Sequence, residues 1–183
     1  MGGIFPFSNM FHFTDSEAKL LIKSLVYLYD SREQANSHWL DYFAKKGLKT
    51  REKKLESGDY SVMAPGGIIK GIERDIYFSD NIVIERKNSL EELSGNLTVG
   101  RDRFNSELKR TNATVYLIIE DGEGWERIMD GRYETNFQPL SFYHSLNSMI
   151  AKYGMQVHFM PRKLAPLHAH HLLEMYVRKY FGI

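Results

Sequence analysis

The chain has 183 residues, no cysteine, and 24 basic against 23 acidic residues, which gives a formal net charge of +1. The lack of cysteine excludes disulfides and thiolate metal sites and favours an intracellular setting, while the near balance of charge neither requires nor excludes a nucleic-acid partner. No apolar run approaches the roughly 18 residues that a membrane-spanning helix needs, so we expect no membrane partner.

Residues 1–22 are predicted to form an N-terminal arm followed by a short helix, which Thr14 or Asp15 can cap. This start lacks the basic residues of a signal peptide, and Pro6 stands where a myristoylation pattern has Ser or Thr. Residues 23–183 are then expected to form a single domain, since 43% apolar residues are ample for a core at this length.

The next segment alternates between strand and helix patterns. Residues 24–33 carry a short apolar run that ends in charges and indicate a buried strand. Apolar residues recur at helical spacing over 33–46, with Gly47 as a helix stop. Residues 48–64 indicate two strands separated at Ser57-Gly58.

A glycine-rich stretch, 66–71, is predicted to form an extended β-hairpin or flap. The segments 75–78 and 82–87 are expected to pair as a second hairpin through a turn at 79–81. The remaining pattern predicts helices at 89–95, 100–111, 139–153 and 166–181, and strands at 114–121 and 155–160. This order of elements predicts an α/β protein in which helices cover both faces of a mixed sheet.

The strand at 82–87 ends in three successive charges, Glu85, Arg86 and Lys87, which are costly to bury unless they are paired or bound. Because strand side chains alternate, Glu85 and Lys87 share one face and Arg86 points to the other. A carboxylate beside an ammonium group suits binding of a hard cation such as Mg²⁺ together with contact to a phosphate or an attacking water.

A second carboxylate is expected from a neighbouring strand, and Asp59 is the candidate. It follows Gly58, which permits a close backbone approach or an unusual φ, and it opens a strand that should pair near 82–87. Asp30, at the end of the first apolar strand, is a possible third acid. An acid on one strand and Glu-x-Lys on the next is the general pattern of restriction-endonuclease-like nucleases, although a surface hairpin with solvated charges gives the same letters.

Several motifs together are more specific than this pattern. The chain resembles the nuclease domain of the XPF/Mus family of structure-specific DNA endonucleases, which includes the archaeal Hef nuclease. The resemblance lies in YLYDSRE with Asp30, Arg32 and Glu33, in the GDY triplet at 58–60, in IVIERK followed by Glu91, in the helix GRDRFNSELKR, and in the strand YLIIED. Order and register hold over residues 25–160.

The resemblance implies a restriction-endonuclease-like fold and a Mg²⁺- or Mn²⁺-dependent endonuclease acting on branched, flap or junction DNA, as a homodimer. It implies that Asp59 and Glu85 bind the metal, that Asp30 adds charge to it, and that Lys87 orients the attacking water. Glu33 and Arg86 complete the implied catalytic set by organising the site, with Glu33 as the expected partner of Arg86.

Contacts with DNA are expected from Arg32, Arg101 and Arg103. A helix-start ion pair is the alternative for Arg32 and a solvated helix face is the alternative for Arg101, whereas Arg103 is favoured because the family tends to carry Arg at that place. Glu91 departs from the family, which usually has Asp at that place. Many members also carry a tandem helix-hairpin-helix module, for which these 183 residues leave no room. The grip on DNA is therefore expected from the domain's own surface, a second subunit or a separate DNA-binding protein.

Other functions stay open at this point. The family also has degenerate partners, so a non-catalytic DNA-binding or scaffold subunit is the main alternative, and a sequence-specific restriction enzyme is another. A compact form suits a phage or bacterial source. The late helix carries His168, His170, His171 and Glu174, but successive residues face different ways, so a core or dimer helix is favoured over a zinc site.

Overall fold

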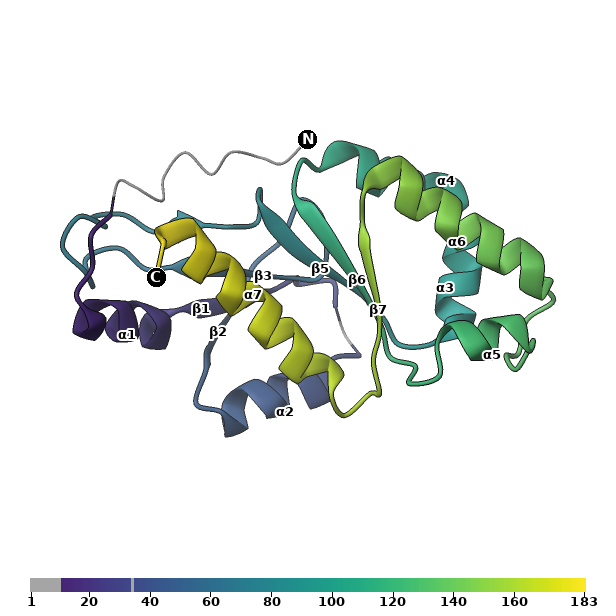
Figure 1. Ribbon diagram of the computed structural model, residues 1–183, viewed down its shortest axis with the longest axis horizontal. Coiled ribbons are helices and arrows are strands. Elements are labelled where there is room, and N and C mark those ends of the chain that lie inside the picture. Colours follow the sequence, from purple (N-terminus) through teal and green to yellow (C-terminus); the bar gives the residue numbers. More distant parts are fainter. Residues whose placement is uncertain (1–10, 34) are drawn as a thin grey trace.

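The computed structural model of the chain describes residues 11–33 and 35–183. A single seven-stranded mixed sheet runs through these residues and is flanked by helices (Figure 1). The strands lie in the order β2-β1-β3-β5-β6-β7, and β4 also pairs with β3. Their bounds are β1 Val26–Tyr29, β2 Lys49–Glu52, β3 Tyr60–Ala64, β4 Ile76–Tyr77, β5 Ile82–Lys87, β6 Thr114–Ile119 and β7 Gln156–Phe159. The predicted α/β class is confirmed.

The directions of the strands bring most of their carboxyl ends to one edge of the sheet. β1 is parallel to β2 and antiparallel to β3, which is in turn antiparallel to β5, and β5, β6 and β7 run parallel. The carboxyl ends of β1, β2, β5, β6 and β7 therefore meet the start of β3 at a single edge. In open α/β sheets, ligands bind outside such carboxyl ends.

Three helices, α1 (Asp15–Ser24), α2 (Ser37–Lys45) and α7 (Ala165–Phe181), cover one face of the sheet. Trp39 and Phe43 from α2 pack there with Ile82 and Ile84 of β5. Both aromatic side chains are buried, as the helical spacing over 33–46 predicted.

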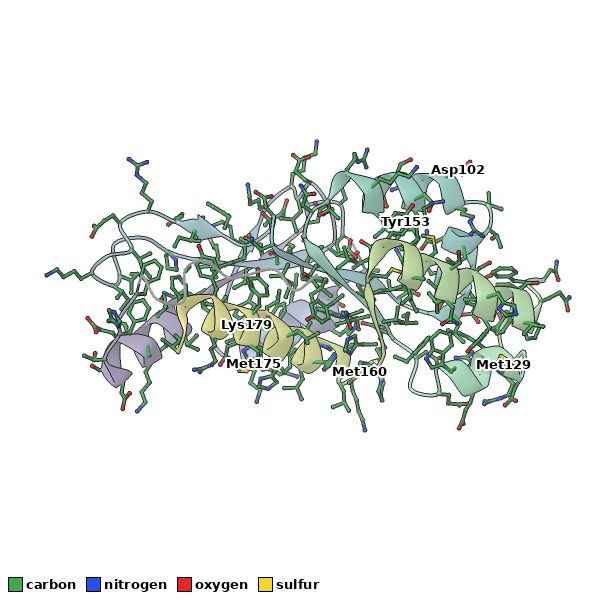
Figure 2. All side chains as sticks on the ribbon, turned by 45° about the horizontal axis from the view of Figure 1, so that its top comes forward. Asp102, Met129, Tyr153, Met160, Met175 and Lys179 are labelled. Atoms are coloured by element: carbon green, nitrogen blue, oxygen red, sulfur yellow. The ribbon has the colours of Figure 1, made fainter. Side chains whose placement is uncertain are left out.

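The other face carries α3 (Leu90–Leu97), α4 (Arg101–Arg110), α5 (Trp125–Met129) and α6 (Pro139–Tyr153), which gather at one end of the sheet in Figure 1. Val83 packs on this side, between Ile82 and Ile84 that point the opposite way. Tyr153, labelled in Figure 2, donates from its hydroxyl to Asn105 Oδ1 at 2.6 Å and so joins the end of α6 to α4.

Local signals account for several element ends. Thr14 caps α1 in a reciprocal capping box with Glu17, and Gly47 adopts a φ of 66° just after α2. Pro139 opens α6 as predicted. The helix α5 was not predicted, because a five-residue helix is too short to show a period.

The predicted hairpin between 75–78 and 82–87 is wrong. β4 and β5 both run antiparallel to β3, with Ile76 opposite Ala64 and Ile84 opposite Tyr60. They are two parts of one interrupted strand, and the residues between them turn out of the ladder through a hydrogen bond from Asn81 N to Phe78 O of 2.9 Å. The turn signal at 79–81 was real, but it marks an interruption and not a reversal.

The stretch 66–71 forms the loop of a hairpin between β3 and β4. Ile69 and Ile72 are buried in the same core cluster as α7, so the loop folds against the domain and does not project as a flap. Two apolar residues within the glycine-rich stretch and at its end are enough to hold it down.

Residues 1–10 of the predicted arm lie outside the described residues. Phe11 and Phe13 stack on each other and both pack against Phe181 of α7. Leu21 is fully buried in the core that α7 shares. The division of the chain at residue 22 stays a prediction. Among the described residues, none of the helices combines the length and apolar character required to cross a bilayer.

Candidate active site

A polar cleft of about 310 Å³ opens at the edge where the carboxyl ends of the strands meet. Its walls come from the loop before β3, the end of β5, and the helices α3 and α4. Most of the sequence-predicted site lines this cleft: Asp30, Arg32, Glu33, Asp59, Glu85, Arg86, Lys87 and Arg103. The topology therefore brings together residues that are far apart in the chain.

Asp59 is fixed against β5 by two backbone contacts. Its N–H donates to Ile84 O at 2.8 Å, and the N–H of Arg86 donates to its carboxylate at 2.7 Å. Gly58 makes this approach possible: its φ is +70°, and a Cβ there would lie 2.7 Å from Val83 Cβ. Both reasons given for a glycine before Asp59 apply, and Asp59 is held beside the strand that carries Glu85.

Glu85 and Lys87 lie on the same face of β5, as strand alternation predicted. Lys87 Nζ is 2.7 Å from Glu85 Oε1 and 3.5 Å from Glu92 Oε1 on α3. The side chains of Glu85 and Lys87 are only 13% and 9% exposed, and the ammonium group also lies 5.5 Å from the centre of the Phe104 ring. Contacts with Glu85, Glu92 and Phe104 together hold this ammonium group in place.

The carboxylates outnumber the cations at the floor of the cleft. Burial, followed by repulsion from Glu85, raises the pKa of Asp59 well above its ordinary value. Burial opposes the charged form of Lys87, but the surrounding carboxylates, Glu85 first among them, raise its pKa. Lys87 is therefore an ammonium ion at neutral pH, while ionised Asp59 lacks sufficient positive charge around it.

This donor set fits a hard divalent cation. Asp59 and Glu85 offer carboxylate oxygens at a polar cleft, and the pKa of Asp59 is raised by burial and then by Glu85, both of which a bound cation would offset. In the part of the chain that the structure describes, side chains able to hold a metal do not gather in threes. Mg²⁺ accepts such a site, because it commonly binds one or two carboxylates together with waters and substrate phosphates.

Asp30 lines the same cleft but its carboxylate is already engaged. One oxygen accepts from Arg32 N and Nε at 2.8 and 2.7 Å, and the other accepts from Arg32 Nη2 at 3.1 Å and Leu55 N at 2.7 Å. Although burial acts against the charged form, these bonds lower the pKa of Asp30. A role for Asp30 in metal binding stays a prediction, and it requires Arg32 to release part of this contact.

Arg86 occupies the opposite face of β5 in a buried ion network. Its Nη1 lies 2.9 Å from Glu33 Oε1, which confirms the expected partner, and its Nε lies 2.9 Å from Glu120 Oε1. Glu120 also accepts from Trp39 Nε1 and His38 Nε2, each at 2.6 Å. Glu120 was not among the predicted site residues, and its position at the end of a buried strand was the available signal.

Arginines line the rim of the cleft. The side chains of Arg32 and Arg103 are 59% and 84% exposed. Arg110, near the other end of α4, also lines the cleft. Arg101 is different, because its guanidinium contacts Ser145 Oγ on α6 at 3.4 Å and it is not part of the cleft wall. Its predicted contact with DNA stays a prediction.

The acid that follows the Glu-Arg-Lys motif also differs from expectation. Glu91 accepts from Glu134 N at 3.1 Å and lies near Arg127, so it faces away from the cleft. Glu92 lines the cleft in its place. Farther away, His168 Nε2 contacts His158 Nδ1 at 2.9 Å and His170 pairs with Glu174, and these pairs do not form a metal cluster among the described residues.

Comparison with known proteins decides the family. The profile of the ERCC4 domain matches residues 29–164, which is most of the chain and includes every residue of the cleft floor. The chain belongs to the ERCC4 domain family. This confirms the resemblance to an XPF-type nuclease domain and places the chain in a family of structure-specific DNA nucleases.

Two solved structures share the fold of this ERCC4 domain. XPF from Aeropyrum pernix has a TM-score of 0.60 and 22% identity over 84% of this chain, and XPF from Aeropyrum pernix in a complex with DNA has a TM-score of 0.59 and 22% identity over 84%. The chain covers 66% and 65% of them, just under two thirds of their length. A search of curated proteins found no match.

Proposed function

We propose that this ERCC4 domain is a Mg²⁺- or Mn²⁺-dependent endonuclease that hydrolyses phosphodiester bonds in branched, flap or junction DNA. The observation that supports this is the meeting of Asp59 and Glu85 across β3 and β5, beside the Lys87 ammonium group, in a cleft rimmed by arginines. A divalent ion bound there supplies Lewis-acid polarisation of a phosphoryl oxygen and lowers the pKa of water.

Each residue at the floor has a role that its contacts support. Asp59 and Glu85 are the proposed metal ligands, and the Arg86 N–H holds the Asp59 carboxylate in place. Lys87 keeps its charge, and it lines the cleft with its Nζ 2.7 Å from Glu85 Oε1. From there it can donate a hydrogen bond to an attacking water or to a phosphate oxygen.

The remaining predicted residues act around this centre. Asp30 adds negative charge to the metal site when Arg32 turns toward DNA, and Arg103 meets the phosphate backbone from α4. Such contacts position DNA without reading its sequence. Glu33 and Arg86 organise the site from the far face of β5. The proposed partners are branched DNA and a second copy of the chain, with a separate DNA-binding protein as an additional source of grip.

The cleft favours catalysis over a scaffold role. A non-catalytic subunit has no use for a half-buried Asp59 whose pKa is raised, since uncompensated charge only costs stability. Retention of this charge beside Lys87 is expected when the site binds a cation during function. The same feature does not separate structure-specific cleavage from sequence-specific cleavage, so the substrate has to be tested directly.

The test is a cleavage assay with a fork, a flap, a Holliday junction and plain duplex, each with Mg²⁺ and with excess EDTA. We expect cleavage of branched substrates only with the metal, and its abolition in Asp59→Ala and Glu85→Ala. Asp80→Ala, an exposed acid just before β5, is the matched control and should cut at the parent rate. Full activity of either cleft variant would show that the site is misassigned, and cutting in EDTA would exclude the metal role.

A further inference from the structure

The edge strand β2 and its flanks carry a dense basic segment. Residues 45–54 contain six basic residues and one acid, a formal charge of +5 in a chain whose total is +1. The remaining residues therefore sum to −4, so positive charge is concentrated here. All of the basic side chains in this segment are exposed: Lys45, Lys46, Lys49, Arg51, Lys53 and Lys54.

Strand geometry arranges part of this charge in a row. Alternation along β2 puts Lys49 and Arg51 on one face of the sheet, with their Cα atoms about 6.6 Å apart, and Lys53 follows directly after the strand ends at Glu52. Arg51 Nη1 contacts Met63 Sδ at 3.4 Å, and Lys53 Nζ lies 5.1 Å from the centre of the Tyr77 ring. The row formed by Lys49, Arg51 and Lys53 therefore lies on the face of the sheet that carries Met63 of β3 and Tyr77 of β4.

At this end of the sheet the face is covered by side chains of the strands and of the loop after β2. Its apolar cluster consists of Val26, Leu28, Leu55 and Met63, all from strands or from the loop after β2. The helices α3 to α6 gather at the opposite end of the sheet, around β6 and β7 (Figure 1). Arg51, Lys53 and the 38% exposed Tyr77 form the outer layer here.

The row also leads to the proposed active site. β2 is parallel to β1 and ends at the edge that holds the cleft, and Lys53 N donates to Tyr29 O at 3.0 Å. Leu55, two residues later, donates to the Asp30 carboxylate, and Glu56 lines the cleft itself. A nucleic-acid strand bound along Lys49, Arg51 and Lys53 would therefore reach the wall of the cleft.

We propose that this row binds the single-stranded arm of a branched DNA substrate and directs it to the cleft, an inference that rests on the proposed function. Proteins bind single-stranded nucleic acid with a line of cations, which contact the phosphates, and with exposed aromatic rings, on which the bases stack. Arg51 is paired with Asp75 at 3.8 Å, but both side chains are nearly half exposed, so the pair is weak and exchanges for phosphate.

Lysine on an edge strand also prevents strand addition between molecules. That role needs charge on the edge but not phosphate contact, so the two roles differ in their response to DNA and to salt. Binding of labelled oligothymidine in EDTA, followed by fluorescence anisotropy over a salt series, measures the phosphate contacts directly. No cleavage is involved, so the result is independent of whether Glu85 and Asp59 are catalytic.

The test variant is Lys49→Gln/Arg51→Gln/Lys53→Gln. Loss of three phosphate contacts should lower the slope of log affinity against log salt by about 2, and weaken binding by on the order of tenfold or more at low salt. The matched control, Lys19→Gln/Lys23→Gln/Lys152→Gln, removes three exposed charges elsewhere and should keep the slope. Lys49→Arg/Lys53→Arg should bind like the parent protein, and this second variant guards against misfolding.

Several outcomes would overturn the proposal. The parent protein failing to bind oligothymidine, or an equal loss in the test and control triples, would show that the row is not the contact. An equal loss of affinity for a hairpin duplex would make it a general phosphate surface and not a single-strand site. Unchanged binding combined with self-association on a sizing column would assign the row to edge protection. Failure of the nuclease assay with this slope intact would reject the proposed function alone.

Discussion

The two faces of β5 differ although their residues alternate along one strand. Arg86 points into a closed network in which Glu33 and Glu120 balance its charge, and Glu120 is fully buried in its side chain. Glu85 and Lys87 point into a polar cleft whose acids are not balanced by the cations around them. One strand thus carries a satisfied ion network on one side and an unsatisfied one on the other.

This difference predicts different roles for the two faces of β5. A satisfied buried network fixes geometry, since removal of one partner leaves an uncompensated charge. An unsatisfied cluster is suited to bind what compensates it, which in the proposed function is a cation and then a phosphate. The N–H of Arg86 links the two, because it holds the Asp59 carboxylate while the Arg86 side chain is anchored on the far face. Breaking either side should therefore give a different kind of defect.

The largest expected effect lies on the closed side. Glu120→Ala leaves Arg86 with Glu33 alone and removes the acceptor of Trp39 Nε1, so the free energy of unfolding should fall by about 3–5 kcal/mol. Urea unfolding of the full chain measures this. Glu120→Gln keeps an acceptor but loses the charge, so its free energy of unfolding should lie between those of the parent protein and of Glu120→Ala.

The control for that change is Glu123→Ala, an exposed acid only three residues away that pairs with Arg132. Exposed pairs contribute up to about 1 kcal/mol, so this variant should unfold near the parent midpoint. An unchanged midpoint for Glu120→Ala would show that the network does not hold β5, and the contrast between its two faces would lose its physical basis.

On the open side the expected effect has the opposite sign. The folded pKa of Asp59 is raised, so between its unfolded value and its folded value the native state holds more protons than the unfolded state, and stability falls as pH rises through that window. Asp59→Asn removes this cost and should be more stable than the parent at neutral pH in EDTA. The gain should disappear as pH falls to the ordinary carboxyl range.

Mg²⁺ should reverse the order of these two proteins. A ligand at a hundred times its Kd stabilises the native state by about 2.7 kcal/mol, and the parent should gain it while Asp59→Asn does not. Urea midpoints at pH 5 and pH 8, with Mg²⁺ and with EDTA, measure both effects, and Asp80→Asn serves as control. A parent protein that does not respond to Mg²⁺ would mean that the charge in the cleft has another purpose.

Much of this contrast could be predicted from the sequence, because it rests on short-range rules. The period of a strand separates Arg86 from Glu85 and Lys87 whatever the rest of the chain does. Gly58 before Asp59 indicated close approach to another strand, and the structure shows that approach at Val83. The strand after Asp59 was expected to pair near 82–87, and the structure places Tyr60 opposite Ile84.

Tertiary detail escaped prediction where several elements meet. The network of Glu120 draws on α2, β5 and Arg162 after β7, and no local pattern connects them. The contact between Arg32 and the Asp30 carboxylate depends on the conformation of the turn after β1, which the sequence DSRE does not determine. β4 was misassigned because a two-residue strand takes its pairing from β3 and not from its own sequence.

The smallest expected effect decides which acid after the motif belongs to the open side. α3 begins at Leu90 behind the Ser89 cap, and this start turns Glu92 toward Lys87 and Glu91 toward Arg127. Glu92→Gln removes a partly exposed partner at 3.5 Å, worth up to about 1 kcal/mol, so kcat on a branched substrate should fall by no more than about fivefold. Glu91→Gln keeps an acceptor for Glu134 N and should leave kcat unchanged. A larger loss in Glu91→Gln than in Glu92→Gln would favour the register of the family motif over the orientation of α3, and would place Glu91 in the cleft when DNA is bound.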